Sequence, residues 1–181
     1  MDCLITGDIR PNTGAVLKEI SEAEYFDKKV LATWKSAEPI AIPKDWLRLE
    51  FDDPGPVIAG DAKATNIVRS SLLGVNGIKH LSNNYVFRGR TDIHLRTGAY
   101  IKLKKFATNS ELASQILIDV VGTTKEFYHY SDFCMAGERA TIQKLFERLN
   151  ERVTNEKTRR HLISLIANSP QQLFHKKKYH S

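Results

Sequence analysis

Two short runs, residues 92–96 and 100–104, alternate polar and apolar residues, and they constrain the fold more than any other sequence feature. The apolar positions of the two runs are Ile93, Leu95, Ile101 and Leu103. A period of two is typical of a strand with one face in water. A three-residue loop that ends at Gly98, which can adopt the left-handed conformation, would align these positions across a hairpin. The pattern therefore predicts an antiparallel hairpin with one apolar face.

The other face of the predicted hairpin, together with the residues that lead into it, is basic. The candidate polyanion-binding residues here are Arg88, Arg90, His94, Arg96, Tyr100, Lys102, Lys104 and Lys105. Cationic side chains contact phosphates, and aromatic side chains among them can stack on unpaired bases. The alternative interpretation is a solvated sheet face whose aromatic side chains partly pack inward.

Positive charge is concentrated in two blocks of the chain. Residues 79–105 carry seven Lys and Arg against one Asp, and residues 138–181 carry ten against four Glu, a net charge of +6 in each block. Residues 1–78 and 106–137 each have a net charge of −3. The second basic block adds the candidates Arg159, Arg160, Lys176, Lys177 and Lys178. Concentrated positive charge attracts nucleic acid and anionic lipid, so we expect a polyanion as partner.

Strand patterns dominate the first half of the chain and helix patterns the last part. The predicted strands cover residues 15–20, 30–34, 46–51 and, less clearly marked, 127–130. The predicted helices cover residues 62–73, 108–121, 138–153 and 159–167. This order predicts a single α+β domain over residues 1–170, with an antiparallel sheet packed against helices and a helical C-terminal part. A flexible basic tail is expected at residues 171–181.

No catalytic constellation is evident in the sequence. The spacing from Gly55 to Gly60 matches a phosphate loop, but Asp61 and Ala62 stand where that loop needs Lys and then Ser or Thr. The histidines lack the spacing of a zinc site, and Cys134 is typical of a buried thiol rather than a nucleophile. We therefore predict no enzyme, no cofactor and no metal site, with a hydrolase of unrecognised type as the alternative.

Two segments resemble the matrix proteins of rhabdoviruses, including plant-infecting members. They are the passage Tyr100–Val121 and the following segment Tyr130–Arg139. The second is similar to a segment of that family in which a Tyr is followed by a Gly and a basic residue where a helix begins. The resemblance implies a twisted sheet packed against helices, self-association, condensation of a nucleocapsid and lining of a membrane. The chain departs from the family because it has no long lysine-rich N-terminal arm and no Pro-Pro-x-Tyr or Pro-Thr-Ala-Pro motif.

These observations predict a non-enzymatic, matrix-like viral structural protein. The expected partners are nucleic acid or a nucleocapsid, an anionic membrane surface bound peripherally, and further copies of the chain. We expect a cytoplasmic or virion location without signal peptide or membrane span, and two reduced cysteines. The alternatives are a viral RNA-binding accessory protein, such as a silencing suppressor or movement protein, and a cellular interaction module.

Overall fold

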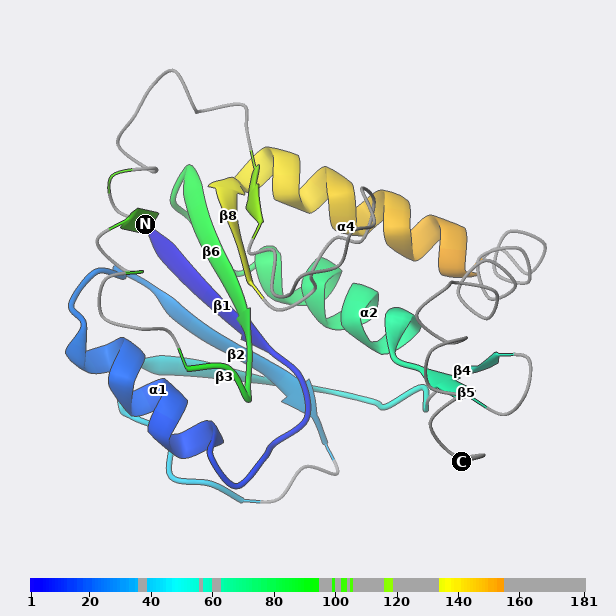
Figure 1. Ribbon diagram of the computed structural model, residues 1–181, viewed down its shortest axis with the longest axis horizontal. Coiled ribbons are helices and arrows are strands. Elements are labelled where there is room, and N and C mark those ends of the chain that lie inside the picture. Colours follow the sequence, from blue (N-terminus) through cyan, green and yellow to red (C-terminus); the bar gives the residue numbers. More distant parts are fainter. Residues whose placement is uncertain are drawn as a thin grey trace, which may run out of the picture.

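The computed structural model describes residues 1–35, 39–55, 57–59, 63–94, 99, 102, 103, 105, 116–118 and 134–154. The described helices stand between and after runs of strands (Figure 1). In chain order they are β1 (Asp2–Thr6), α1 (Thr13–Glu22), β2 (Lys29–Trp34), β3 (Trp46–Phe51), β4 (Val57–Ala59), β5 (Lys63–Thr65), α2 (Ile67–Ile78), β6 (Tyr85–Arg90), β7 (Ile116–Ile118), β8 (Cys134–Glu138) and α4 (Arg139–Thr154).

The six-stranded sheet has the order β3-β2-β1-β6-β8-β7. Its first four strands are parallel, whereas β8 runs antiparallel to β6 and β7 runs antiparallel to β8. The chain therefore builds outward from β1 to β2 and β3, and then returns to place β6 on the other side of β1. The direction of winding reverses between β1 and β6, and such a reversal opens a crevice at the carboxyl ends of the strands. Strands β4 and β5 form a separate antiparallel pair.

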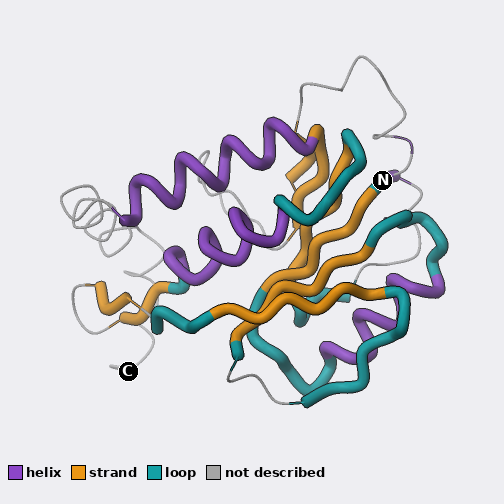
Figure 2. The backbone as a smooth tube through the Cα atoms, turned by 180° about the vertical axis from the view of Figure 1, so that it is seen from behind, coloured by secondary structure: helices purple, strands orange, loops and turns teal. Residues whose placement is uncertain are grey.

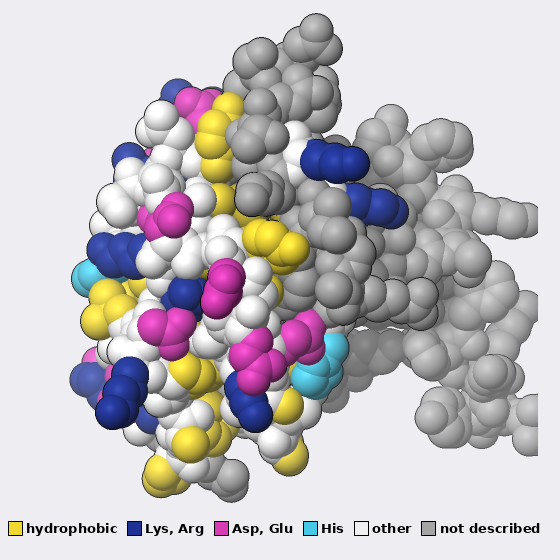
Figure 3. All heavy atoms as spheres, turned by 90° about the vertical axis from the view of Figure 1, so that its left-hand side faces the viewer, with side chains coloured by type: hydrophobic (Ala, Val, Ile, Leu, Met, Phe, Trp, Pro, Cys, Tyr) yellow, Lys and Arg dark blue, Asp and Glu magenta, His cyan; other side chains and the backbone are white. Residues whose placement is uncertain are grey.

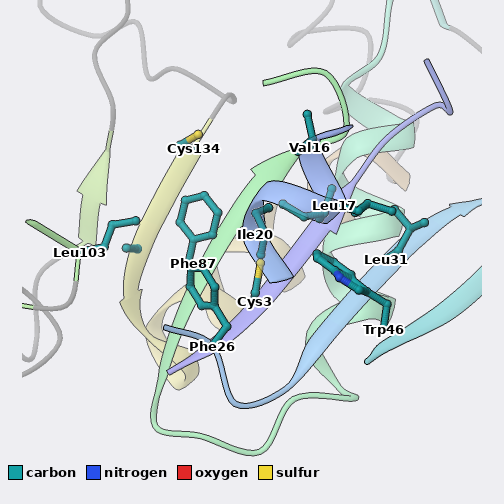
Figure 4. Packing of buried hydrophobic residues seen from close by; sticks show 12 residues of the cluster. Cys3, Val16, Leu17, Ile20, Phe26, Leu31, Trp46, Phe87, Leu103 and Cys134 are labelled. Atoms are coloured by element: carbon teal, nitrogen blue, oxygen red, sulfur yellow. The ribbon is translucent and has the colours of Figure 1, made fainter. Parts of the chain in front are cut away.

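Helices cover both faces of the sheet, as the opposite views of Figures 1 and 2 show. On one face, α1 packs its apolar side onto the sheet in a cluster with β1, β2, β3 and β6. The cluster members drawn in Figure 4 include Cys3, Val16, Leu17, Ile20, Phe26, Leu31, Trp46 and Phe87. On the other face, α2 and α4 pack over β1, β2 and β6. Every residue of β1 and β2 is buried, as expected for parallel strands covered on both sides.

Several predicted elements are confirmed. The mixed helix and strand content with a C-terminal helix is present, and strands 30–34 and 46–51 and helix 138–153 match β2, β3 and α4 closely. The helix predicted at 62–73 exists but is shifted to Ile67–Ile78, because Lys63–Thr65 forms β5. Gly74, the residue that follows the predicted end of this helix and could have ended it, lies inside α2.

Other predictions are wrong. The sheet is mostly parallel rather than antiparallel. Residues 15–20 lie in α1, because their apolar positions are spaced to cover one side of a helix. Ile116–Ile118, expected in a helix, forms β7, where it pairs with β8. The predicted hairpin is absent from the described positions, since residues 91–94 lie in turn and coil and Lys102, Leu103 and Lys105 are helical.

The remaining predicted elements fall outside the described residues. They are the hairpin loop 96–98, the rest of helix 108–121, strand 127–130, helix 159–167 and the tail 171–181. Within the described part of the chain, no helix is both long enough and apolar enough to cross a membrane.

Candidate functional site

A pocket lies at the carboxyl ends of β1, β2 and β6, beside the first turn of α2. This is the place where the winding of the sheet reverses, which is where open α/β sheets bind their ligands. The described residues that line it are Thr6, Gly7, Asp8, Arg10, Trp34, Asn66, Arg69, Ser70, Leu73, Arg88, Arg90, Thr91 and Asp92. The pocket has a volume of about 80 Å³ and is partly open to solvent.

The loop that follows β1 is held in place by hydrogen bonds from β2 and from the residue that follows β6. Thr33 Oγ1 donates to the Gly7 carbonyl at 2.9 Å, and Thr91 Oγ1 donates to the Asp8 carbonyl at 2.6 Å. Gly7 has φ of +139°, and a Cβ there would lie 2.9 Å from Thr91 Oγ1. A glycine is therefore needed at this position, because a side chain would strain the backbone and collide with Thr91, the residue after β6.

Arg88 of β6 is buried, with 2% of its surface exposed. Its Nε donates to Thr6 Oγ1 at 3.0 Å, and its Nη2 donates to Ser70 Oγ at 3.1 Å. The guanidinium carbon lies 5.7 Å from the centroid of the Phe146 ring in α4, within the range of a cation–π interaction. Arg88 thus joins β1, α2 and α4 at the inner wall of the pocket.

Arg69, in the first turn of α2, forms the second cationic group of the pocket. Its Nη2 lies 2.5 Å from Asp8 Oδ1 and 2.8 Å from Asp53 Oδ2. Its guanidinium also lies over the Trp34 ring, 5.2 Å from the centroid. Two carboxylates and an indole ring therefore fix the orientation of this guanidinium before any ligand binds.

Arg90 and Asp92 form the rim of the pocket beyond β6. Arg90 Nε donates to Asp92 Oδ1 at 2.9 Å, and Arg90 Nη2 donates to Asp92 Oδ2 at 2.8 Å. These hydrogen bonds from Arg90, and the charge of the guanidinium, hold the pKa of the Asp92 carboxyl below its ordinary value against the opposing effect of partial burial. Asp92 is therefore ionised at neutral pH, and the pair is a charge-assisted, two-bond contact.

The electrostatic character of the pocket favours an anion. Four arginines and two aspartates line it, so the lining carries a net formal charge of +2. The N-terminus of α2 points its first turn at the same place, and its N-cap residue Asn66 makes no side-chain capping bond. The backbone N–H groups and dipole of a helix N-terminus add positive potential.

Five of the thirteen residues predicted to bind a polyanion lie in the described structure, and two of these five line the pocket. Arg88 and Arg90 line the pocket, and His94 lies 2.9 Å from Glu19 of α1. Lys102 and Lys105 are exposed. Arg96, Tyr100, Lys104, Arg159, Arg160, Lys176, Lys177 and Lys178 lie outside the described residues.

Sequence reasoning missed most of the pocket, above all Asp8, Trp34, Arg69 and Asp92. One signal could have indicated it. The apolar run that opens the chain leads directly into Thr6-Gly7-Asp8, an arrangement typical of a buried parallel strand that ends in a ligand-binding loop. The period-two pattern after position 90 predicted a hairpin instead.

The described part of the face drawn in Figure 3 carries no large basic patch. On the face drawn in Figure 3, Lys and Arg side chains are interspersed with Asp and Glu side chains over the coloured part of the surface. The fields of neighbouring charges of opposite sign largely cancel at a distance, and salt further screens charges that are more than about 8 Å apart at physiological ionic strength. On this face the described residues therefore present a mixed charge pattern.

The fold and the pocket together define a mixed α/β domain with a parallel sheet core and a cationic pocket at its point of reversal. Neither the models of known protein families nor the curated proteins contain a match to this chain. Among the residues that the structure describes, no group of three or more His, Cys, Asp or Glu side chains could hold a metal ion.

Proposed function

We propose that the protein binds a phosphorylated small molecule, of the nucleotide class, in the pocket at the carboxyl ends of β1, β2 and β6. The observation that carries this proposal is the coincidence of two features at one place. The pocket lies at the reversal point of a parallel sheet, and four arginines line it. Ligands of open α/β sheets bind at that point, and guanidinium groups match the geometry of phosphate oxygens.

The size of the pocket indicates which part of the ligand it would enclose. A volume of about 80 Å³ is well below the roughly 300 Å³ at which pockets begin to enclose drug-sized molecules. One phosphate group would fill the enclosed part, and the remainder of the ligand would lie across the open mouth. Nucleoside diphosphates fit this description, because they carry a terminal phosphate on a larger body.

The carboxylates of the pocket have a positioning role in this proposal. Asp8 and Asp92 each bind a guanidinium group, so Arg69 and Arg90 are held in fixed orientations. A phosphate that enters the pocket would interact with guanidinium charges that are already held in place, without first ordering these side chains. Holding the donors in place lowers the entropic cost of binding.

Calorimetric titration with inorganic phosphate, pyrophosphate, ADP, GDP and UDP tests the proposal. We expect the diphosphates to bind more tightly than phosphate, and binding to weaken as salt is added. Arg90→Gln should weaken diphosphate binding by about 10- to 100-fold, because one hydrogen bond to a charged group contributes about 1.5–3 kcal/mol. The matched control is Lys35→Gln, which removes an exposed cation paired with Asp52 outside the pocket and should leave binding unchanged.

The proposal fails if none of these phosphates binds to the folded protein, or if the two variants weaken binding equally. A crystal soaked with UDP or ADP would locate the ligand directly. Density for the terminal phosphate away from Arg69, Arg88 and Arg90 would also contradict it.

The matrix-like function predicted from the sequence is a second proposal. It is supported by the exposed side chains of Lys102 and Lys105 in the described structure and by the net charge of +6 in residues 138–181. Binding to single-stranded RNA and to vesicles that contain phosphatidylserine, measured against salt, tests it. Replacing Lys102 and Lys105 by Gln should weaken binding and make the salt dependence shallower, and an unchanged slope would contradict this role.

A further inference from the structure

The outer edge of β3 is open among the described residues. β3 is the terminal strand of the sheet, and its one paired neighbour in the described structure is β2. The Phe51 carbonyl accepts from Lys35 N at 2.9 Å at the inner edge, whereas Trp46 N donates to the Pro43 carbonyl on the other side. Because backbone groups alternate along a strand, the N–H and C=O groups of Arg48 and Glu50 face outward.

The outward groups are self-complementary. If two copies of β3 meet antiparallel about a two-fold axis at Leu49, Arg48 of each copy lies opposite Glu50 of the other. The backbone groups of these two residues would then exchange four hydrogen bonds in hydrogen-bonded pairs, with Leu49 at the intervening non-hydrogen-bonded position. The two opposed side-chain pairs have opposite charges, which stabilises an antiparallel ladder.

The side chains already stand where this pairing needs them. Arg48 Nη2 lies 2.5 Å from Glu50 Oε1 of the same chain, so both charged groups lie on one face of the strand. Arg48 Nε is buried and has no hydrogen-bond partner in the described structure. A carboxylate from the facing strand can accept from it, and satisfying a buried donor is favourable. On the opposite face, Leu47 is 41% exposed and would meet Phe51 of the second copy.

Other registers of the same strands lack this match. A shift that centres the two-fold axis on Arg48 or on Glu50 opposes like charges, which destabilises a strand pair. If the two-fold axis instead lies between two residues, the pairing shifts by one residue. The outward backbone groups of one strand then lie opposite the inward groups of the other, so the ladder loses its hydrogen bonds.

We propose that β3 binds β3 of a second copy of this chain, centred on Leu49, so that the two six-stranded sheets become one continuous sheet. No described residue of β3 lines the pocket, so this interface is independent of phosphate binding. An open edge strand is a template for pairing with another strand, and a symmetric pair closes both edges at once.

Light scattering coupled to size-exclusion chromatography tests the proposal on the wild-type protein and two variants. The variants Arg48→Glu and Glu50→Arg oppose like charges within a homodimer, so each should elute as a monomer. An equimolar mixture of the two variants restores opposite charges across the interface and should elute as a heterodimer. Neither variant retains the pair within its own chain, so recovery on mixing reports on the interface alone.

The matched control changes an exposed ion pair of the same kind elsewhere. In α1, Lys18 Nζ lies 3.7 Å from Glu22 Oε1, and both side chains are exposed. The variants Lys18→Glu and Glu22→Arg should therefore each remain dimeric like the wild type. Circular dichroism melting of every variant checks that it is folded. The proposal is overturned if the wild type is monomeric at about 100 μM, which would populate dimers with micromolar dissociation constants.

A cross-link provides a second measurement that does not depend on charge. Non-hydrogen-bonded partners in an antiparallel pair have Cα atoms about 4.5 Å apart, within the range of a disulfide. Leu49→Cys should therefore form a disulfide-linked dimer under mild oxidation. Leu47→Cys should not, because its partner across the axis is Phe51. Equal cross-linking of the two variants, or none from Leu49→Cys, contradicts the proposed register.

Discussion

Gly74 in the middle of α2 lies against the ring of Phe146 in α4, so closely that a Cβ on Gly74 would lie 2.5 Å from Phe146 Cε1. Glycine is unfavourable inside helices by roughly 1 kcal/mol relative to alanine. It is accommodated here because it lets the two helices approach, and Phe146 can then reach the guanidinium of Arg88. The helix contact and the inner wall of the pocket are thus coupled through one ring.

The first prediction concerns this contact. Gly74→Ala should lower the free energy of unfolding by about 1–3 kcal/mol, because the added methyl group overpacks the interface and forces the two helices apart. Urea denaturation measures the change. Gly14→Ala in α1 is the control, since its Cβ would lie 3.9 Å from the Ala41 carbonyl and should stabilise by up to about 1 kcal/mol. Equal effects at the two positions would mean that the contact with Phe146 is not tight.

The second prediction concerns Gly7 in the loop after β1. Gly7→Ala should weaken the binding of nucleoside diphosphates more than it lowers the melting temperature, because the strain falls on the loop that shapes the pocket. Calorimetric titration with UDP and a melting curve give the two readouts. Gly55→Ala is the comparison, since Gly55 also has a positive φ, of +73°, but no atom of the described residues lies within 4 Å of its Cβ position. Binding by this comparison variant should be close to wild type.

The third prediction concerns the buried carboxylate of Asp2, at the amino end of β1. It accepts hydrogen bonds from Ser82 N at 2.7 Å, Asn83 N at 2.9 Å and Asn83 Nδ2 at 2.6 Å. Burial alone would raise the pKa of Asp2, but these hydrogen bonds outweigh burial and hold it below 3.8. Asp2 therefore stabilises the fold above pH 3.8, and this contribution is lost as the pH falls through its lower folded-state pKa.

Asp2→Asn should lower the free energy of unfolding by about 1–3 kcal/mol at pH 7, because an amide cannot accept all of these bonds. The difference from wild type should shrink as the pH falls below 3.8. Urea denaturation at a series of pH values measures both effects. The control Asp52→Asn changes a carboxylate that is 87% exposed and should have little effect. A constant difference at every pH would contradict the role of the charged form.

The fourth prediction concerns the two thiols. Cys3 and Cys134 are buried, with 0% and 5% exposure, in the cluster beneath α1. Burial raises the pKa of the Cys3 thiol well above its ordinary value, despite the opposing charge of Lys29. Because the thiolate is the reactive form, Ellman's reagent should modify Cys3 and Cys134 slowly in the native protein and at once in urea. Rapid reaction of the native protein would show that this cluster opens.

Patterns that depend on neighbouring residues were sufficient for several elements. Helix α4 follows from Ile142, Phe146 and their neighbours at helical spacing. An apolar stripe of this kind indicates a helix with one buried side, whichever element covers that side. Strands β2 and β3 follow from short runs rich in apolar residues that are bounded by turn residues. Helix α2 was placed correctly in type but not in extent, because Gly74 marks a close approach to Phe146 rather than a helix end.

By itself, the sequence determined that the chain mixes strands and helices, where β2, β3 and α4 lie, and that basic residues gather in residues 79–105 and 138–181. Only the tertiary structure decided that the sheet is mostly parallel and that β6 lies beside β1. It also decided that Arg88 turns inward to Thr6 and Ser70. Strand pairing joins residues more than 80 positions apart, such as Leu4 and Arg88. No local pattern encodes that choice, because it depends on which arrangement lets helices cover both faces of the sheet.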